Sequence, residues 1–112
     1  MCMRSILRAS TESGETWDDP SEDLLFILLE DIEGGREQFL ILERLSDASQ
    51  QTYIQTIRND DGSYCVERRD GGPDSHCTTN ATDMRTAHAV ISSWAFDLPA
   101  MAPPVVWTPL RL

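Results

Sequence analysis

The chain has 112 residues, which is enough for one domain with a single modest core and excludes a second catalytic domain within it. Its content of 40% hydrophobic and 25% charged residues is ordinary for a globular protein and excludes wholesale disorder. Nineteen acidic residues and nine basic residues, all arginine, give a net charge of -10, which argues against direct nucleic-acid binding because phosphate contacts need a basic surface.

The acidic charge fits a basic protein partner or mere solubility equally well. Three cysteines, Cys2, Cys65 and Cys77, are too few and too odd in number for a disulfide framework. The first ten residues, MCMRSILRAS, contain no apolar run of signal-peptide length, and no segment approaches the roughly 20 apolar residues of a membrane span. We therefore expect a cytoplasmic protein with no membrane partner.

Residues 1–18 show no sustained hydrophobic period and are rich in Ser, Thr, Glu and Asp. This composition predicts a flexible N-terminal arm. Periodic segments begin only after it, which places a single domain over residues 19–112.

The segment WDDPSEDLLFILLEDIEGG predicts the first helix. Asp19 is the expected N-cap, Pro20 suits the first turn, and Glu22 occupies the third helical position of a capping box. Gly34 and Gly35 supply the stop signal. The middle of this helix is so apolar that another layer, most simply a sheet, must cover it.

Three strands are expected next, within residues 37–45, 51–59 and 63–69, because these runs are rich in β-branched and aromatic residues and are separated by turn signals. After a Gly-Gly-Pro turn, residues 76–82 would add a short fourth strand at the sheet edge. On the third strand, alternation places Tyr64, Val66 and Arg68 on one face and Cys65, Glu67 and Arg69 on the other.

A second amphipathic helix is predicted from residue 83 to 97, with Thr82 as its N-cap. Residues 98–112 form a proline-rich tail that favours an extended course, with a brief last strand or an aromatic plug near Trp107. The expected fold is α+β: an antiparallel meander of three to four strands packed by an N-terminal and a C-terminal helix in two layers.

The third strand ends in four charges, Glu67 to Asp70, directly before the Gly-Gly-Pro turn. They form either solvated cross-strand ion pairs of small energetic value or a recognition edge whose arginines make bidentate contacts with a partner's carboxylates. The turn is expected to bring Arg69, Asp70 and His76 to one side. The candidate binding residues are therefore Glu67, Arg69, Asp70 and His76.

Trp107 is a fifth candidate. It follows the proline-rich stretch, so it either anchors this segment to the domain or, if exposed, forms a binding hot spot.

Cysteine and histidine side chains supply the competing, chemical interpretation. Zinc binding by Cys65, His76, Cys77 and His88 is disfavoured, because the adjacent His76 and Cys77 point in opposite directions on an extended chain and no second close pair exists. A Cys–His nucleophile pair would need a thiolate beside a base. A cysteine on a strand is more often a core residue, so we expect no catalytic residue, metal or cofactor.

The segments QTYIQTIRNDDGSYCVERRDGGPDSH, AHAVISSWAFDLP and VVWTPL resemble small actinobacterial proteins that pair a YIQ strand with a VExRDGGPDxH strand and turn. Those proteins continue with a helix ending in Trp-Ala and a late tryptophan. The same order is similar to that of immunity proteins of the first-numbered Imm family of bacterial polymorphic toxin systems, over about residues 21–110. The matching positions are Glu67, Arg69, Asp70, Gly71, His76, Trp94 and Trp107.

The resemblance implies a protein without enzymatic activity that binds and blocks a cognate toxin. The first hypothesis is therefore an inhibitor whose acidic surface meets a basic partner. A second hypothesis is a small enzyme or ligand-binding module that uses Cys and His beside the sheet. A third is a homodimeric structural protein joined through the sheet edge or the proline-rich tail.

Overall fold

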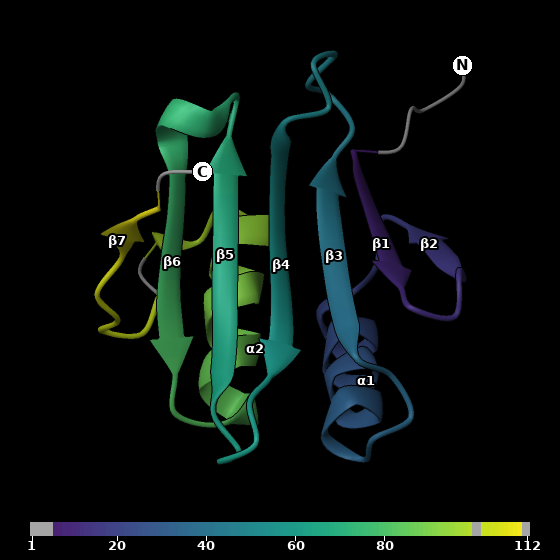
Figure 1. Cartoon of the computed structure of the whole chain (residues 1–112). Coiled ribbons are helices and arrows are strands. Elements are labelled where there is room, and N and C mark those ends of the chain that lie inside the picture. Colours follow the sequence, from purple (N-terminus) through teal and green to yellow (C-terminus); the bar gives the residue numbers. More distant parts are fainter. Residues whose placement is uncertain (1–5, 100–101, 111–112) are drawn as a thin grey trace.

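Seven antiparallel strands form one sheet, and both helices pack against the same face of it (Figure 1). The computed structural model describes residues 6–99 and 102–110. Along the sheet the order of the strands is β2-β1-β3-β4-β5-β6-β7. The strands are β1 (Leu7–Thr11), β2 (Thr16–Asp18), β3 (Phe39–Arg44), β4 (Thr52–Arg58), β5 (Tyr64–Asp70), β6 (His76–Ala81) and β7 (Thr108–Pro109). The helices are α1 (Glu22–Glu33) and α2 (Met84–Ala95), and a short 3-10 turn, η1 (Pro73–Ser75), precedes β6.

The expectation of a sheet of three to four strands is wrong, because the expected meander, β3 to β6, is only the centre of a larger sheet. On one side β1 and β2 extend it; they lie in residues 7–18, where a flexible arm was expected. On the other side β7, from the proline-rich tail, pairs with β6. The β1 strand was missed because its core-facing residues, Leu7, Ala9 and Thr11, include only one large apolar side chain.

The N-cap of α1 is Ser21 rather than Asp19. The Ser21 hydroxyl accepts a hydrogen bond from the backbone N–H of Leu24 at 3.1 Å. Asp19 instead has a left-handed backbone, with φ of 50°, and its carboxylate accepts the N–H groups of Ile6 and Leu7 at 2.8 and 3.0 Å. Asp19, which the local sequence pattern predicted to be the helix cap, therefore makes a long-range contact with the start of β1 instead. In α2 the N-cap is Asp83 rather than Thr82.

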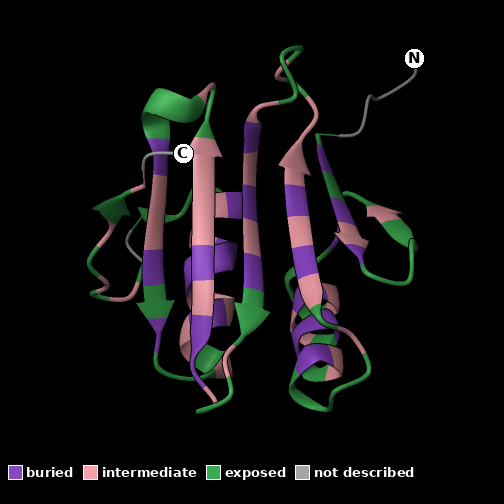
Figure 2. Cartoon of the chain, viewed as in Figure 1, coloured by how far each residue is buried: buried purple, intermediate pink, exposed green. Residues whose placement is uncertain are grey.

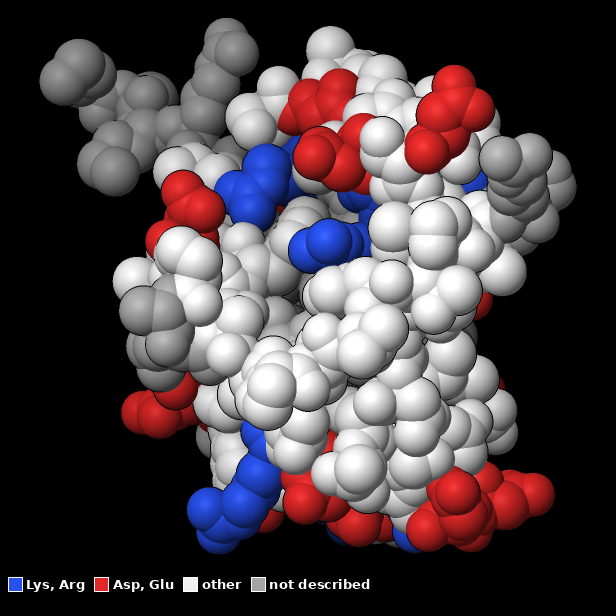
Figure 3. All heavy atoms as spheres, turned by 90° about the vertical axis from the view of Figure 1, so that its left-hand side faces the viewer, with Lys and Arg blue, Asp and Glu red and all other residues white. Residues whose placement is uncertain are grey.

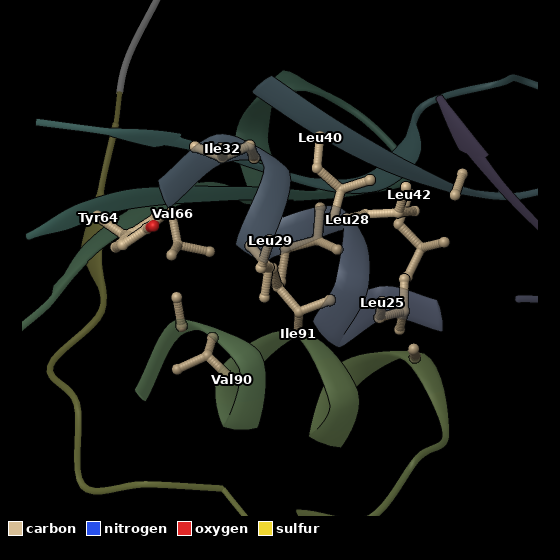
Figure 4. Close-up of a cluster of buried hydrophobic side chains, with 14 of the residues drawn as sticks. Leu25, Leu28, Leu29, Ile32, Leu40, Leu42, Tyr64, Val66, Val90 and Ile91 are labelled. Atoms are coloured by element: carbon tan, nitrogen blue, oxygen red, sulfur yellow. The ribbon is translucent and has the colours of Figure 1, made fainter. Parts of the chain in front are cut away.

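The core lies between the helices and the sheet. Figure 4 shows Leu25, Leu28 and Leu29 of α1 facing Val90 and Ile91 of α2 and the side chains of the strands beyond them. Each fully buried Leu or Ile contributes roughly 1.5–3 kcal/mol. The sheet supplies the other half of the core with Leu40, Leu42, Ile54, Tyr64, Val66 and Ala81. The structure therefore gives the chain a single core on one side of the sheet only.

The loop between β3 and β4 is closed by Asp47. Its carboxylate accepts hydrogen bonds from the Thr52 hydroxyl at 2.6 Å and from the Ser49 hydroxyl and N–H, which lower the pKa of Asp47 to about 2. Thr52 Oγ1 also accepts the N–H of Gly71 at 3.1 Å. The ends of β3, β4 and β5 are thereby tied together at one end of the sheet.

Each helix has 12 residues, and neither is long and apolar enough to cross a membrane; this holds for the residues that the structure describes.

Candidate functional site

The sheet face opposite the helices is not covered by any element in the described ranges 6–99 and 102–110 (Figure 1). We call this surface the open face. Figure 2 shows that burial alternates along the strands: the buried residues face the helices, and the partly buried residues between them face the open side. The open face of the four central strands consists of Phe39, Ile41, Glu43, Tyr53, Gln55, Ile57, Cys65, Glu67, Arg69, His76, Thr78 and Asn80.

His76 is the most deeply buried side chain of the open face, with only 3% of the residue exposed. It pairs across the strands with Arg69, whose Nε donates to His76 Nδ1 at 3.1 Å. The Tyr53 ring lies edge-on to the imidazole, with 6.2 Å between the ring centroids. Because the guanidinium can only donate, Nδ1 must be the acceptor, which puts the proton of a neutral His76 on Nε2.

The proton on Nε2 of His76 has no hydrogen-bond acceptor in the described structure, although Glu67 Oε2 lies 3.6 Å away. Glu67 accepts a hydrogen bond from Gln55 Nε2 at 2.6 Å. At the other end of the cluster, Arg69 Nη1 donates to Gln51 Oε1 at 3.4 Å. A polar row therefore crosses β4, β5 and β6, and it holds one cation and one carboxylate in defined orientations on a surface that solvent can reach.

Three of the five predicted binding residues, Glu67, Arg69 and His76, thus lie together on the open face. Asp70 does not join them, because alternation along β5 turns it to the helix side together with Arg68. Trp107 also lies on that side, where the Arg68 guanidinium stacks over its ring with 4.2 Å between Cζ and the ring centroid. The expectation that the turn gathers Arg69, Asp70 and His76 on one side is therefore wrong for Asp70.

The cysteines and histidines do not converge. Cys65 lies on the open face next to the Thr78 hydroxyl, at 3.6 Å, whereas Cys77 pairs with Arg68 and faces the helices. His88 lies between the helices, where its Nε2 is 3.0 Å from the Glu22 carbonyl oxygen and its ring meets Phe26 edge-on. Among the described residues no group of three or more His, Cys, Asp or Glu side chains could hold a metal ion.

Sequence reasoning missed three residues near these side chains: Tyr53 and Gln55 on the open face, and Arg44 on the helix side. Arg44 lies over the ring of Trp94, which the sequence had marked only as a position that matches the resemblance. Tyr53 lies opposite Arg69, and Gln55 lies opposite Glu67. Nothing in the sequence of β4 alone marks these positions, because their partners depend on the register between strands.

Comparison of this chain with protein-family models, with curated proteins and with solved structures finds no match.

Proposed function

We propose that this chain is a non-enzymatic cytoplasmic binding protein that inhibits a basic protein partner, in the manner of an immunity protein that blocks a toxin. The open face is the observation that carries the proposal. It presents side chains from four adjacent strands, without a covering layer among the described residues. The resemblance to the first-numbered Imm family, made at the level of sequence, points in the same direction.

The composition of the open face suits protein recognition. It combines apolar side chains, of which Ile57 is 48% exposed, with Tyr53, Arg69 and Glu67. Tyrosine and arginine are enriched among the residues that dominate binding energy, and charges at fixed positions select the partner and its orientation. Because Arg69 and Glu67 are already oriented by His76 and Gln55, binding costs little additional side-chain entropy.

The charge of the molecule favours a basic partner. Within the described residues, arginine forms ion pairs with only three of the carboxylates, in the pairs Arg8–Asp18, Arg36–Asp31 and Arg58–Glu33. Most of the nineteen acidic residues are therefore available to the long-range field of the protein. A net charge of -10 accelerates the encounter with a positively charged protein and disfavours acidic competitors.

The alternative of a Cys–His enzyme receives no support from the geometry. Cys65 pairs with Asn80, four residues along β6 from His76, and Cys77 is on the opposite face. A homodimer joined through the sheet edge is disfavoured, because the edge strands β2 and β7 have only three and two residues, too few to pair well with a second copy.

The test is affinity capture from a native lysate with the immobilised full chain, at low and at moderate salt. The variant Ile57→Arg places a charge on the open face, where Ile57 pairs with Phe39 and Cys65. Its matched control is Ile27→Arg, because Ile27 is 52% exposed but lies on α1, away from the open face. We expect a basic protein to be retained by the wild type and by Ile27→Arg, to be lost with Ile57→Arg, and to be released by salt.

The captured protein is then purified and its own activity is titrated with this chain. Inhibition that is complete at one equivalent supports the proposal. Capture that is equal with Ile57→Arg and wild type, the absence of any basic protein, or a partner whose activity is unchanged would each contradict it.

A further inference from the structure

A second surface lies on the helix side of the sheet. It is bounded by the end of α2, by the ends of β3 to β5 and by residues 102–107 of the proline-rich tail. It is a recess of about 690 Å³, within the range of roughly 300–1,000 Å³ that is common for small-molecule sites. Figure 3 shows it as a hollow that exposes arginine atoms, with acidic groups above. We call this recess the Arg–Trp pocket, and its charged and aromatic lining consists of Arg44, Arg68, Trp94, Trp107, Asp70 and Asp97.

Both arginines of the Arg–Trp pocket are stacked on tryptophan rings. Cζ of Arg44 lies 4.5 Å from the ring centroid of Trp94, and Cζ of Arg68 lies 4.2 Å from that of Trp107. Stacking uses the flat face of a guanidinium and leaves its in-plane N–H groups available for other partners. The two indoles therefore hold the two guanidinium groups in place without using their hydrogen-bond donors.

Most of these donors have no partner among the residues that the structure describes. Arg44 donates from Nη2 to the carbonyl oxygen of Trp94 at 2.9 Å. Arg68 makes no hydrogen bond and no ion pair to the described residues, although Asp70 and Asp97 line the same pocket. In a chain with ten more acidic charges than basic ones, two arginines outside ion pairs in one recess are unexpected, and they supply a fork geometry that matches a carboxylate.

The carboxylates of Asp70 and Asp97 limit how much negative charge a ligand of this pocket can carry. Two arginines and two aspartates give the pocket no net charge, and the whole protein is strongly acidic, so a polyanion such as a nucleoside triphosphate is repelled. The rest of the wall is largely apolar and includes Val90, Pro103 and Val105. A ligand with a single anionic group and an apolar body fits both the charge of the pocket and its apolar wall.

We propose that the Arg–Trp pocket binds a monocarboxylate with an apolar body. The carboxylate accepts hydrogen bonds from Arg44 and Arg68, and the apolar body lies against the indoles, Val90 and Val105. This site is separate from the open face, so it stands whether or not the chain inhibits a partner.

The test is an NMR titration of the full chain that follows the indole N–H signals of Trp94 and Trp107, with Trp17 as an internal reference outside the pocket. Hexanoate is the first probe, and hexanol and acetate test the carboxylate and the apolar body separately. N-acetyl-leucyl-leucine and its C-terminal amide test whether the carboxylate can come from a peptide terminus. We expect saturable shifts with hexanoate, none with hexanol, and much weaker binding of acetate.

Tighter binding of the dipeptide than of hexanoate would assign the pocket to a peptide terminus, and the reverse would assign it to a free small molecule; both outcomes support a carboxylate site. We expect Arg68→Gln and Arg44→Gln each to weaken hexanoate binding about tenfold, because each removes charge-assisted hydrogen bonds. The matched control is Arg85→Gln, an exposed arginine in the first turn of α2, which should bind hexanoate like the wild type.

If Arg68→Gln does not fold, Arg68→Lys replaces it in the test. Lysine keeps the charge but lacks the planar pair of N–H donors of a guanidinium, so we expect hexanoate to bind several-fold more weakly. Equal binding of hexanol and hexanoate, equal affinity of the wild type and the Arg68 variants, or the absence of saturable indole shifts would overturn the proposal.

Discussion

A single carboxylate at the end of α1 joins three elements of the fold. Tyr64 is fully buried on β5, and its hydroxyl donates to Glu33 Oε2, which also accepts from Arg58 Nε at 3.0 Å. The hydrogen bond from Tyr64 is the main reason why the pKa of Glu33 lies below its usual value of 4.5. Burial, and after it the same hydrogen bond, raise the pKa of Tyr64, so its hydroxyl keeps its proton and remains a donor.

Replacing Tyr64 by Phe keeps the ring in the core and removes only this donor. We expect the free energy of unfolding to fall by about 1 kcal/mol near neutral pH. A carboxyl whose pKa is lowered in the folded state stabilises the fold above its usual pKa, and this stability is lost as the pH falls through the folded-state value. The difference between wild type and Tyr64→Phe should therefore shrink in acid, as measured by urea unfolding at about pH 7 and about pH 3.

The control is Tyr53→Phe on the open face, because no hydrogen bond to the Tyr53 hydroxyl is found among the described residues. This variant should be as stable as the wild type at both pH values. Equal losses in the two variants would show that the contact of Tyr64 with Glu33 is not what stabilises this corner.

At the scale of elements, sequence patterns located the long periodic segments, α1, β3, β4, β5 and α2, because each buries several large side chains at a regular spacing. The edge strands β1 and β2 were not predicted, and a brief last strand near Trp107 was only one of two alternatives for the tail that forms β7. The inward positions of β1 are Leu7, Ala9 and Thr11, and β7 consists of Thr108 and Pro109, which have low strand propensity as a pair. These strands form because a neighbour offers unpaired backbone groups, and that neighbour is distant in the sequence.

Two neighbouring residues at the start of α1 stabilise the fold in different ways: Ser21 caps the helix locally, whereas Asp19 binds the start of β1. Ser21→Ala removes the cap of the first turn and should cost about 1 kcal/mol, with faster hydrogen exchange at the Leu24 amide. Asp19→Ala removes the acceptor of the Ile6 and Leu7 amides, so exchange should accelerate at those amides instead. The measurement is amide exchange followed by NMR at a pH where the chain is fully folded.

Each of these two variants is the control for the other. If Asp19→Ala also accelerates exchange at Leu24 as strongly as Ser21→Ala does, then Asp19 acts as a cap of α1, as its sequence context predicts, and the contact with β1 is secondary.

At the scale of the whole molecule, alternation along β5 was enough to separate Glu67 and Arg69 from Arg68, as the register with β4 shows, but Asp70 was wrongly expected beside Arg69. The turn was expected to bring Arg69 and His76 to one side, but alternation could not show that they pair directly, because that pairing depends on the length of the turn through η1. Nor could it place Trp107 against Arg68, since the path of the proline-rich tail is set by β7 pairing with β6 and by the hydrogen bond from Thr79 Oγ1 to the Val106 carbonyl.

The excess of acidic charge should make the whole fold sensitive to salt. Because few carboxylates of the described residues are paired with arginine, their mutual repulsion opposes the compact state, and ions screen it. We expect Tm at neutral pH to rise between about 0.01 and about 0.5 M NaCl, over which the screening length falls from about 30 Å to a few Å. The matched variant replaces three exposed acids that accept no side-chain hydrogen bonds among the described residues: Asp23→Asn, Glu30→Gln and Asp60→Asn.

This triple variant should have a higher Tm than the wild type in low salt and a smaller rise on adding NaCl, because part of the repulsion has already been removed. A net charge far from zero also makes the acidic surface available to a basic partner, so the same variant should slow association with such a partner without changing the open face. A Tm that falls with NaCl in the wild type would mean that the ion pairs, such as Arg58 with Glu33, outweigh the repulsion among the remaining carboxylates.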